Sequence, residues 1–391
     1  MQATTPRMTR RLLSILLPTF AIAALAVFLI RLGPAGIFPG DFPPIEDLTI
    51  GGADLEPGKI ELTLTNGGPS PVTVSQLLVD DAFWDFSIEP DKEIRRLRSA
   101  TITLEYPWVE AEPVNLKIIT ATGVTFDHTI DVATASPKAN GRFFLTFTAL
   151  GIYIGLLPVL LGMMFLPMMR QISASWIRFL MALTVGILAF IGIETLAEAF
   201  DSSKLLPPAI GGVGLVAVGA ITSFALISAA SRRLKQKSSG DPRWTTALLV
   251  SAGIGLHNLG EGLAVGAAYR LGEIALGTFL VIGFALHNTT EGLGIVSILG
   301  RSRVSLMKLL MLGTIAGAPT ILGGWIGGIF FSPTIAALFL AIAAGAIAEV
   351  IVDVLGAIED ESEGSSRSAT VLLGIGAGVA VMFLTGLLVP A

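Results

Sequence analysis

The sequence predicts a polytopic α-helical membrane protein that carries a small all-β domain near its N-terminus. Three observations predict this fold class. Of the 391 residues, 52% are hydrophobic and 14% are charged, which is far more apolar than a soluble protein. Long apolar runs recur from residue 142 onward, and each is long enough to cross a bilayer. Residues 41–135 instead alternate polar and apolar side chains, as half-buried β-strands do.

The apolar run of residues 12–30 is the first candidate membrane span. It follows Arg7, Arg10 and Arg11, so its N-terminal flank carries the charge that favours a cytoplasmic location. Two interpretations are open. The run can be an uncleaved anchor, or a cleaved signal peptide with alanines at cleavage-site spacing; its length favours the anchor. Residues 1–31 are therefore assigned to an anchor or signal segment, and either interpretation places the next segment outside the cytoplasm.

Residues 32–140 form the predicted extracytoplasmic β-sandwich domain. In residues 59–65 apolar and polar side chains alternate strictly, and Asn66-Gly67-Gly68 then supplies a turn. Similar runs occur at residues 72–79, 83–88, 101–106, 114–120 and 125–132. Six or seven short strands at this spacing predict an immunoglobulin-like sandwich. His128 lies on the same face of its predicted strand as the apolar side chains, so it is interpreted as a packing residue rather than a metal ligand.

Charge is divided unevenly between this domain and the rest of the chain. Residues 32–140 contain 17 acidic and 7 basic residues, a balance of −10, so the remainder carries +5 within the total of −5. We therefore expect the two parts to face different compartments. The chain has no cysteine, which excludes disulfides and thiolate metal sites.

Residues 141–391 form the predicted eight-helix domain. The eight expected spans are residues 143–168, 176–199, 207–230, 244–268, 274–298, 304–330, 334–357 and 369–389. Alternate connections are basic, above all the run 232–237, and the positive-inside rule places these loops in the cytoplasm. We interpret that run as a topology signal and expect no nucleic-acid partner. The predicted location is the plasma or inner membrane, with the β domain and the C-terminus extracytoplasmic.

Two consecutive spans carry the same polar motif. His257-Asn258 is followed by Glu261-Gly262, and His287-Asn288 is followed by Glu291-Gly292. Each histidine lies one helical turn from its glutamate, so both side chains share a face. A single membrane histidine or glutamate is often only a hydrogen-bonded packing residue. The repetition without a basic partner favours a divalent metal ion as the group that neutralises the carboxylates.

The two motif copies resemble the fourth and fifth transmembrane helices of ZIP (Zrt/Irt-like) metal transporters, over about residues 142–391. The resemblance implies uptake of divalent cations by alternating access, through a metal centre between these helices. Zinc is the first candidate, and iron, manganese, cobalt and cadmium suit the same ligands. The metal residues that we predict are His257, Asn258, Glu261, His287, Asn288, Glu291, Glu194 and Glu349. A homodimer and the partner of the β domain stay open.

The sequence departs from the family pattern at two places. Gly260 and Thr290 stand where a proline often precedes the glutamate, so the helix bend is expected to be softer. Ala318-Pro319 stands where many relatives place a bridging glutamate before the proline, which puts a second metal ion in doubt. Glu194 is a candidate replacement ligand or a structural hydrogen-bonding residue, and Glu349 a supporting or vestibule residue.

An intramembrane zinc-dependent hydrolase is the competing class of function. In such an enzyme the metal activates water and holds three protein ligands with one open position. The spans contain no separate acid–base candidate at helical reach of the motif and no third histidine. We therefore expect a transporter rather than an enzyme, with divalent ions as cargo, no cofactor, and the lipid bilayer as its surroundings.

Overall fold

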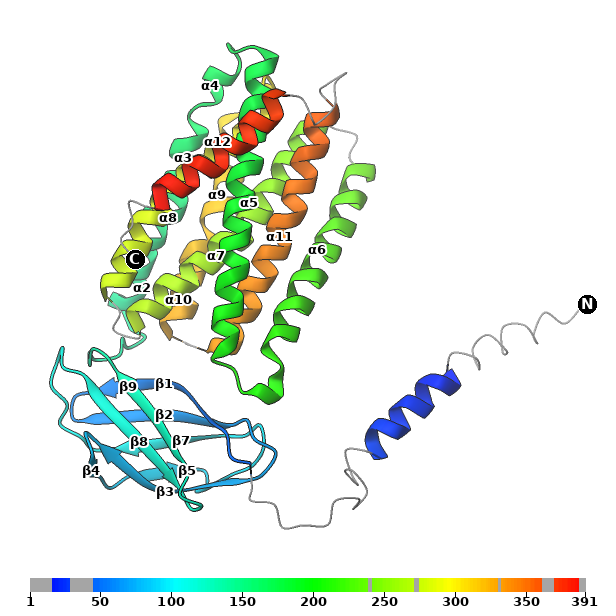
Figure 1. Ribbon diagram of the computed structural model, residues 1–391. Helices are drawn as coiled ribbons and strands as arrows, with labels where there is room; N and C mark the ends of the chain where they lie inside the picture. Colours follow the sequence, from blue (N-terminus) through cyan, green and yellow to red (C-terminus); the bar gives the residue numbers. More distant parts are fainter. Residues whose placement is uncertain are drawn as a thin grey trace, which may run out of the picture. The chain divides into compact units, whose positions relative to one another are not determined.

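The computed structural model describes residues 16–28, 45–237, 241–270, 274–329, 332–360 and 369–386, and the chain divides into two compact units. The first unit, Met1–Ile45, contains one short apolar helix at Leu16–Phe28. The remainder of the predicted span 12–30 lies outside the described residues. The second unit, Glu46–Ala391, contains the β domain and the helical bundle (Figure 1).

The β domain consists of two sheets around one apolar core. The described strands are β1 Leu48–Glu56, β2 Lys59–Asn66, β3 Val72–Val79, β4 Ala82–Phe83, β5 Ser87–Glu89, β6 Glu93–Ile94, β7 Ser99–Leu104, β8 Val114–Thr120 and β9 Thr125–Ile130. One sheet has the order β1-β2-β7-β5 and the other β4-β3-β8-β9, with β6 paired to β3. Alternate residues such as Leu62, Ile102 and Ile118 are fully buried between the sheets, as the period-2 pattern predicts.

Two strand predictions differ from the structure. β1 was not predicted, because Gly51-Gly52 interrupts its alternation; the pairing with β2 shifts register between Ile50 and Ala53 at this point. The prediction of a single strand over residues 83–88 is wrong. β4 pairs with β3 and β5 pairs with β7, so the chain passes from one sheet to the other between them. His128 lies half-buried on β9, which ends its sheet.

The apolar helices of the bundle indicate a multi-pass membrane protein. Its helices are α2 Gly141–Gly151, η1 Ile152–Leu156, α3 Leu157–Met163, α4 Leu166–Met169, α5 Ala174–Lys204, η2 Pro208–Ile210, α6 Gly212–Lys237, α7 Pro242–Arg270, α8 Ile274–Leu299, α9 Leu306–Gly317, α10 Pro319–Ile329, α11 Pro333–Asp360 and α12 Ala369–Gly386. Within the described ranges, six helical stretches are long and apolar enough to cross a membrane. α8 and α12 coincide with the other two predicted spans.

Two of the predicted spans are interrupted near a proline. The span at 143–168 passes from α2 through the π-helical turn η1 into α3, and Pro158 lies at the start of α3. The span at 304–330 breaks between α9 and α10 at Ala318, directly before Pro319. A proline lacks the N–H that would bond the preceding turn, so each break leaves backbone carbonyls available to other helices.

The motif helix α7 occupies a central place in the bundle. It packs against α8, α9, α10 and α11, while α5 packs mainly against α11 and α12 (Figure 1). The two motif-bearing helices α7 and α8 are therefore direct neighbours.

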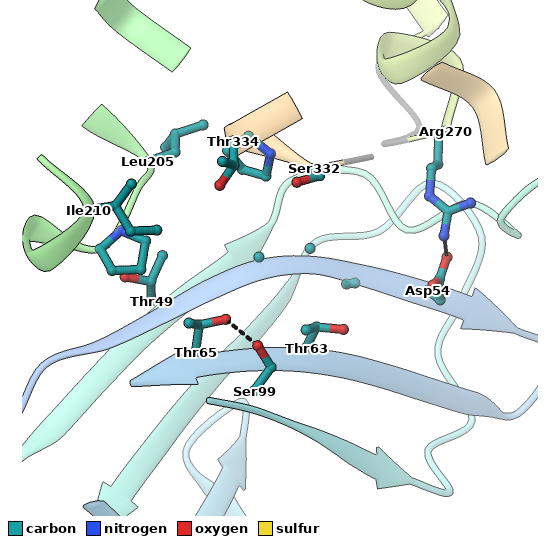
Figure 2. Close-up of a pocket in the computed structure, with 15 residues that line it drawn as sticks. Thr49, Asp54, Thr63, Thr65, Ser99, Leu205, Ile210, Arg270, Ser332 and Thr334 are labelled. Atoms are coloured by element: carbon teal, nitrogen blue, oxygen red, sulfur yellow. Dashed lines mark hydrogen bonds and ion pairs between the residues drawn. The ribbon is translucent and has the colours of Figure 1, made fainter. Parts of the chain in front are cut away.

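The C-terminal end of α7 is also tied to the β domain. Arg270, in the last turn, forms an ion pair with Asp54 of β1 and donates to the carbonyl of Ile329 at 2.5 Å. Figure 2 shows this ion pair at one side of a cavity of about 380 Å³, whose lining includes hydroxyl side chains such as those of Thr63 and Thr65. An arginine in the last turn also complements the helix dipole. The ion pair therefore joins β1 to the helix that carries the first motif.

Asn66 offers a direct test of the β domain. Its side chain is fully buried, donates to the carbonyls of Ser70 and Ile94 at 2.8 Å each, and accepts from the N–H of Gly68 at 2.8 Å. Asn66→Ala leaves these groups without partners, so we expect the domain to lose about 2–3 kcal/mol of stability. Chemical denaturation followed by tryptophan fluorescence measures the loss. Gln76→Ala, which removes an exposed amide from β3, is the control, and equal stability of both variants would contradict this role.

Candidate metal centre

The motif residues of α7 and α8 meet in the interior of the bundle. His257, Asn258 and Glu261 are at most 6% exposed, and Asn288 and Glu291 at most 1%. Their burial follows from the sequence, because each motif lies in the middle of a long apolar helix whose neighbours cover it on several sides. Polar groups at this depth need partners, and each of these side chains has at least one contact with another of the motif residues.

Three ligand groups converge on one point. The carboxylate oxygen Oε1 of Glu261 lies 3.1 Å from Nε2 of His257, and the same oxygen contacts Nε2 of His287. The three ligand atoms all lie within 4.8 Å of one another. Ligand atoms around a tetrahedral zinc ion are about 3.3 Å apart, so small side-chain movements bring this set to coordination distance.

The two asparagines exchange contacts between the motif copies. Asn258 on α7 donates to Oε2 of Glu291 on α8 at 3.3 Å, and Asn288 on α8 donates to Oε2 of Glu261 on α7 at 2.9 Å. Each motif therefore orients the carboxylate of the other. The two copies form one site rather than two separate ones.

Each asparagine also bonds to a carbonyl of an interrupted span. Asn288 donates to the carbonyl of Ile154 at 2.8 Å, and Pro158, four residues later, lacks the N–H that would normally bond it. Asn258 donates to the carbonyl of Ala316 at 3.0 Å, just before the break at Pro319. The broken spans thus fix the amide planes of the site.

Three buried acceptor oxygens at this site have no hydrogen-bond partner among the residues that the structure describes. They are Oδ1 of Asn258, Oδ1 of Asn288 and Oε1 of Glu291. A buried acceptor without a partner costs about 1–3 kcal/mol. All three atoms are oxygens that a cation can bind, and none is a donor. The imidazole nitrogens and carboxylate oxygens of the site, together with these three acceptor oxygens, therefore fit a divalent cation as its ligands.

The charge of the site has no basic counterpart on the motif helices. The Lys and Arg residues of α7 are Arg243 and Arg270 at its two ends, and α8 contains none. Two carboxylates within one buried site repel each other unless a proton or cation lies between them. A cation bound between Glu261 and Glu291 would remove this repulsion.

The glycine of each motif allows another helix to approach closely. A Cβ at Gly262 would lie 2.2 Å from the carbonyl oxygen of Thr320 on α10. A Cβ at Gly292 would lie 2.0 Å from the carbonyl oxygen of Val159 on α3. Both obstacles are backbone atoms, which cannot rotate away. These glycines hold the interrupted spans close enough for their carbonyls to reach the asparagines.

Glu194 and Glu349 lie outside the three-residue cluster. Glu194, on α5, is exposed, although its carboxylate is close enough to His257 and His287 to interact with both electrostatically. Its neighbour Thr195 was not predicted: the hydroxyl lies 3.3 Å from Nδ1 of His257 and can fix the orientation of that ring. Glu349 is buried on α11 and has Ser228 of α6 within hydrogen-bond reach.

Replacing the motif glycine tests whether close helix contact holds the site together. Gly292→Ala would push α3 away from α8, because the added methyl group meets the backbone of Val159. We expect a loss of about 1–3 kcal/mol and weaker metal binding. Thermal unfolding of the purified protein in detergent measures the first effect. Gly376→Ala on α12 is the matched control, since nothing lies within 4 Å of a Cβ there; a loss equal to that of Gly292→Ala would refute the role of the close contact.

Comparison with known proteins gives no family for this chain. No family model matches it, and no curated protein matches it. The functional interpretation therefore depends on the geometry of the site and on the membrane character of the bundle.

Proposed function

We propose that the protein is a ZIP-like transporter that takes up divalent metal cations, with zinc as the first candidate. The observation that carries the proposal is the site shared by α7 and α8. There His257, Glu261 and His287 converge, and three buried oxygens around them lack partners among the described residues. Imidazole nitrogens with carboxylate and amide oxygens suit zinc, iron, manganese and cobalt.

The eight-span arrangement is part of this proposal. The six long apolar stretches together with α8 and α12 would give eight crossings, which places the ends of the bundle domain on one side of the membrane. The basic loop after α6 would then be cytoplasmic, and the β domain and the C-terminus extracytoplasmic. The metal would cross by alternating access to the buried site, without a chemical step on the cargo, and the protein would not act as an enzyme.

Removing either motif carboxylate tests the transport function. Glu261→Ala removes the oxygen that both imidazoles contact, and Glu291→Ala removes the second negative charge. We expect metal uptake into proteoliposomes to fall to the level of empty liposomes in both variants. Asp201→Asn, at an exposed carboxylate that pairs with Lys204, is the control and should transport normally. Normal uptake by both glutamate variants would contradict the proposal.

The number of bound ions provides an independent test. Two divalent ions at Glu261 and Glu291 would set four positive charges against two negative ones, which is unfavourable where the effective dielectric constant is low. We therefore propose one tightly held ion and, if Glu194 contributes, a second and weaker one. Metal titration of the purified protein should give one tight site in both the wild type and Glu194→Gln. Two equally tight sites that persist in Glu194→Gln would contradict this stoichiometry.

A further inference from the structure

A second pair of buried carboxylates lies between α6 and α11. Glu349 is 3% exposed and Asp353 is 7% exposed. They are one helical turn apart on α11, so their side chains share a face and two negative charges lie close together. Figure 1 shows α6 alongside α11, and the two helices pack against each other. Such a pair within an apolar bundle needs positive charge nearby.

Asp353 forms an ion pair with a lysine of the neighbouring helix. Nζ of Lys235 on α6 lies 2.7 Å from Oδ1 of Asp353. The hydroxyl of Ser231, one turn earlier on α6, lies 3.2 Å from the same oxygen and 2.9 Å from Oδ2. The Lys235 side chain is 41% exposed, whereas that of Asp353 is 8% exposed. The ammonium group therefore reaches a buried carboxylate from a position near the surface, on a long and flexible stem.

Only one of the two carboxylate oxygens of Glu349 has a hydrogen-bond partner among the described residues. Ser228 lies within hydrogen-bond reach of the carboxylate, yet the buried oxygen Oε2 has no partner in the described part of the chain. The positive charge of Arg232 also interacts with Glu349, but the Arg232 side chain is exposed to solvent. An unpaired buried carboxylate oxygen next to an ion-paired one leaves an acceptor position that a second cation can use.

This pair lies near the metal centre along the bundle. Gly253 of α7 packs against Val350 of α11, and His257 follows Gly253 by one helical turn. Gly260 of α7 packs against Leu340, so the two helices run in opposite directions. Glu349 is therefore roughly one to two turns, or about 5–10 Å, from the level of the metal cluster. It lies toward the end of the bundle at which α6 ends.

We propose that Glu349 and Asp353 form a second cation site and that Lys235 is its built-in competitor. The ammonium group occupies Asp353 when the site is empty of metal. A divalent cation carries twice the charge, can contact both carboxylates at once, and displaces the lysine toward solvent. This proposal rests on the proposed function only in the choice of a divalent metal ion as the cation that binds. Lys235 would lower the affinity of this site so that an ion arriving from the metal centre is not retained.

The first test is metal binding to the full-length protein in detergent, with Zn²⁺ and Mn²⁺ as probes. Lys235→Gln should strengthen one site tenfold or more, and Glu349→Gln added to Lys235→Gln should abolish that gain. Arg233→Gln, which removes an exposed charge from the same helix, is the matched control and should leave binding unchanged. Unchanged affinity in Lys235→Gln, or a gain that persists without Glu349, would overturn the proposal.

A second test uses the unsubstituted protein and does not depend on whether Lys235→Gln folds. Acetylation of Lys235 by an amine-reactive reagent, followed by mass spectrometry, should be several times faster with saturating Zn²⁺ than without it. Glu349→Gln should remove this difference. A metal-independent rate would count against displacement of the lysine. Neither measurement requires transport, so a protein that binds metal here without uptake would refute the proposed function alone.

Discussion

The arrangement of the bundle depends on the placement of two carboxylates at its centre, where the Lys and Arg residues of their own helices lie no closer than the helix ends. Glu261 and Glu291 would repel each other strongly in a medium of low dielectric constant. The fold limits this repulsion by giving each carboxylate an asparagine donor from the opposite helix and by bringing two imidazoles to Glu261. The remaining charge and the unpartnered oxygens are what a bound cation would neutralise.

Small residues and helix breaks serve this same site. The glycine after each motif glutamate lets α10 and α3 approach until backbone meets backbone. Pro158 then leaves the carbonyl of Ile154 open, and the end of α9 before Pro319 leaves that of Ala316 open, each within reach of an asparagine. In isolation a glycine or a proline weakens a helix. Here their cost is offset by hydrogen bonds between helices that an unbroken, larger-residue helix could not make.

The sequence predicts the motif cluster because the period of the α-helix fixes which residues share a face. His257 and Glu261 are four residues apart, so their side chains lie together on one face of α7. The same motif in α8 indicates a site that the two helices share. The positions of Thr195 and of the Ile154 and Ala316 carbonyls could not be predicted, because they depend on how α5, η1 and α9 pack in three dimensions. The missed strand β1 has a local cause. Its two central glycines carry no side chain and therefore erase the alternation by which the other strands were found.

Glycine contacts between the helices are of two kinds, backbone against backbone and backbone against side chain. α7 meets α10 and α8 meets α3 through backbone contacts at Gly262 and Gly292, and α5 meets α12 through a similar contact at Gly186. At other places the glycine contacts are made by side chains: Val350 of α11 packs on Gly253 of α7, and Thr184 of α5 packs on a glycine of α8. Side chains can change rotamer, whereas close backbone contacts cannot adjust without separating the helices. We therefore expect relative movement to be easiest where α11 meets α7 and where α5 meets α8. His257, Glu261 and His287 all lie on α7 and α8, so such a movement would carry this cluster past α5 and α11 without separating its members.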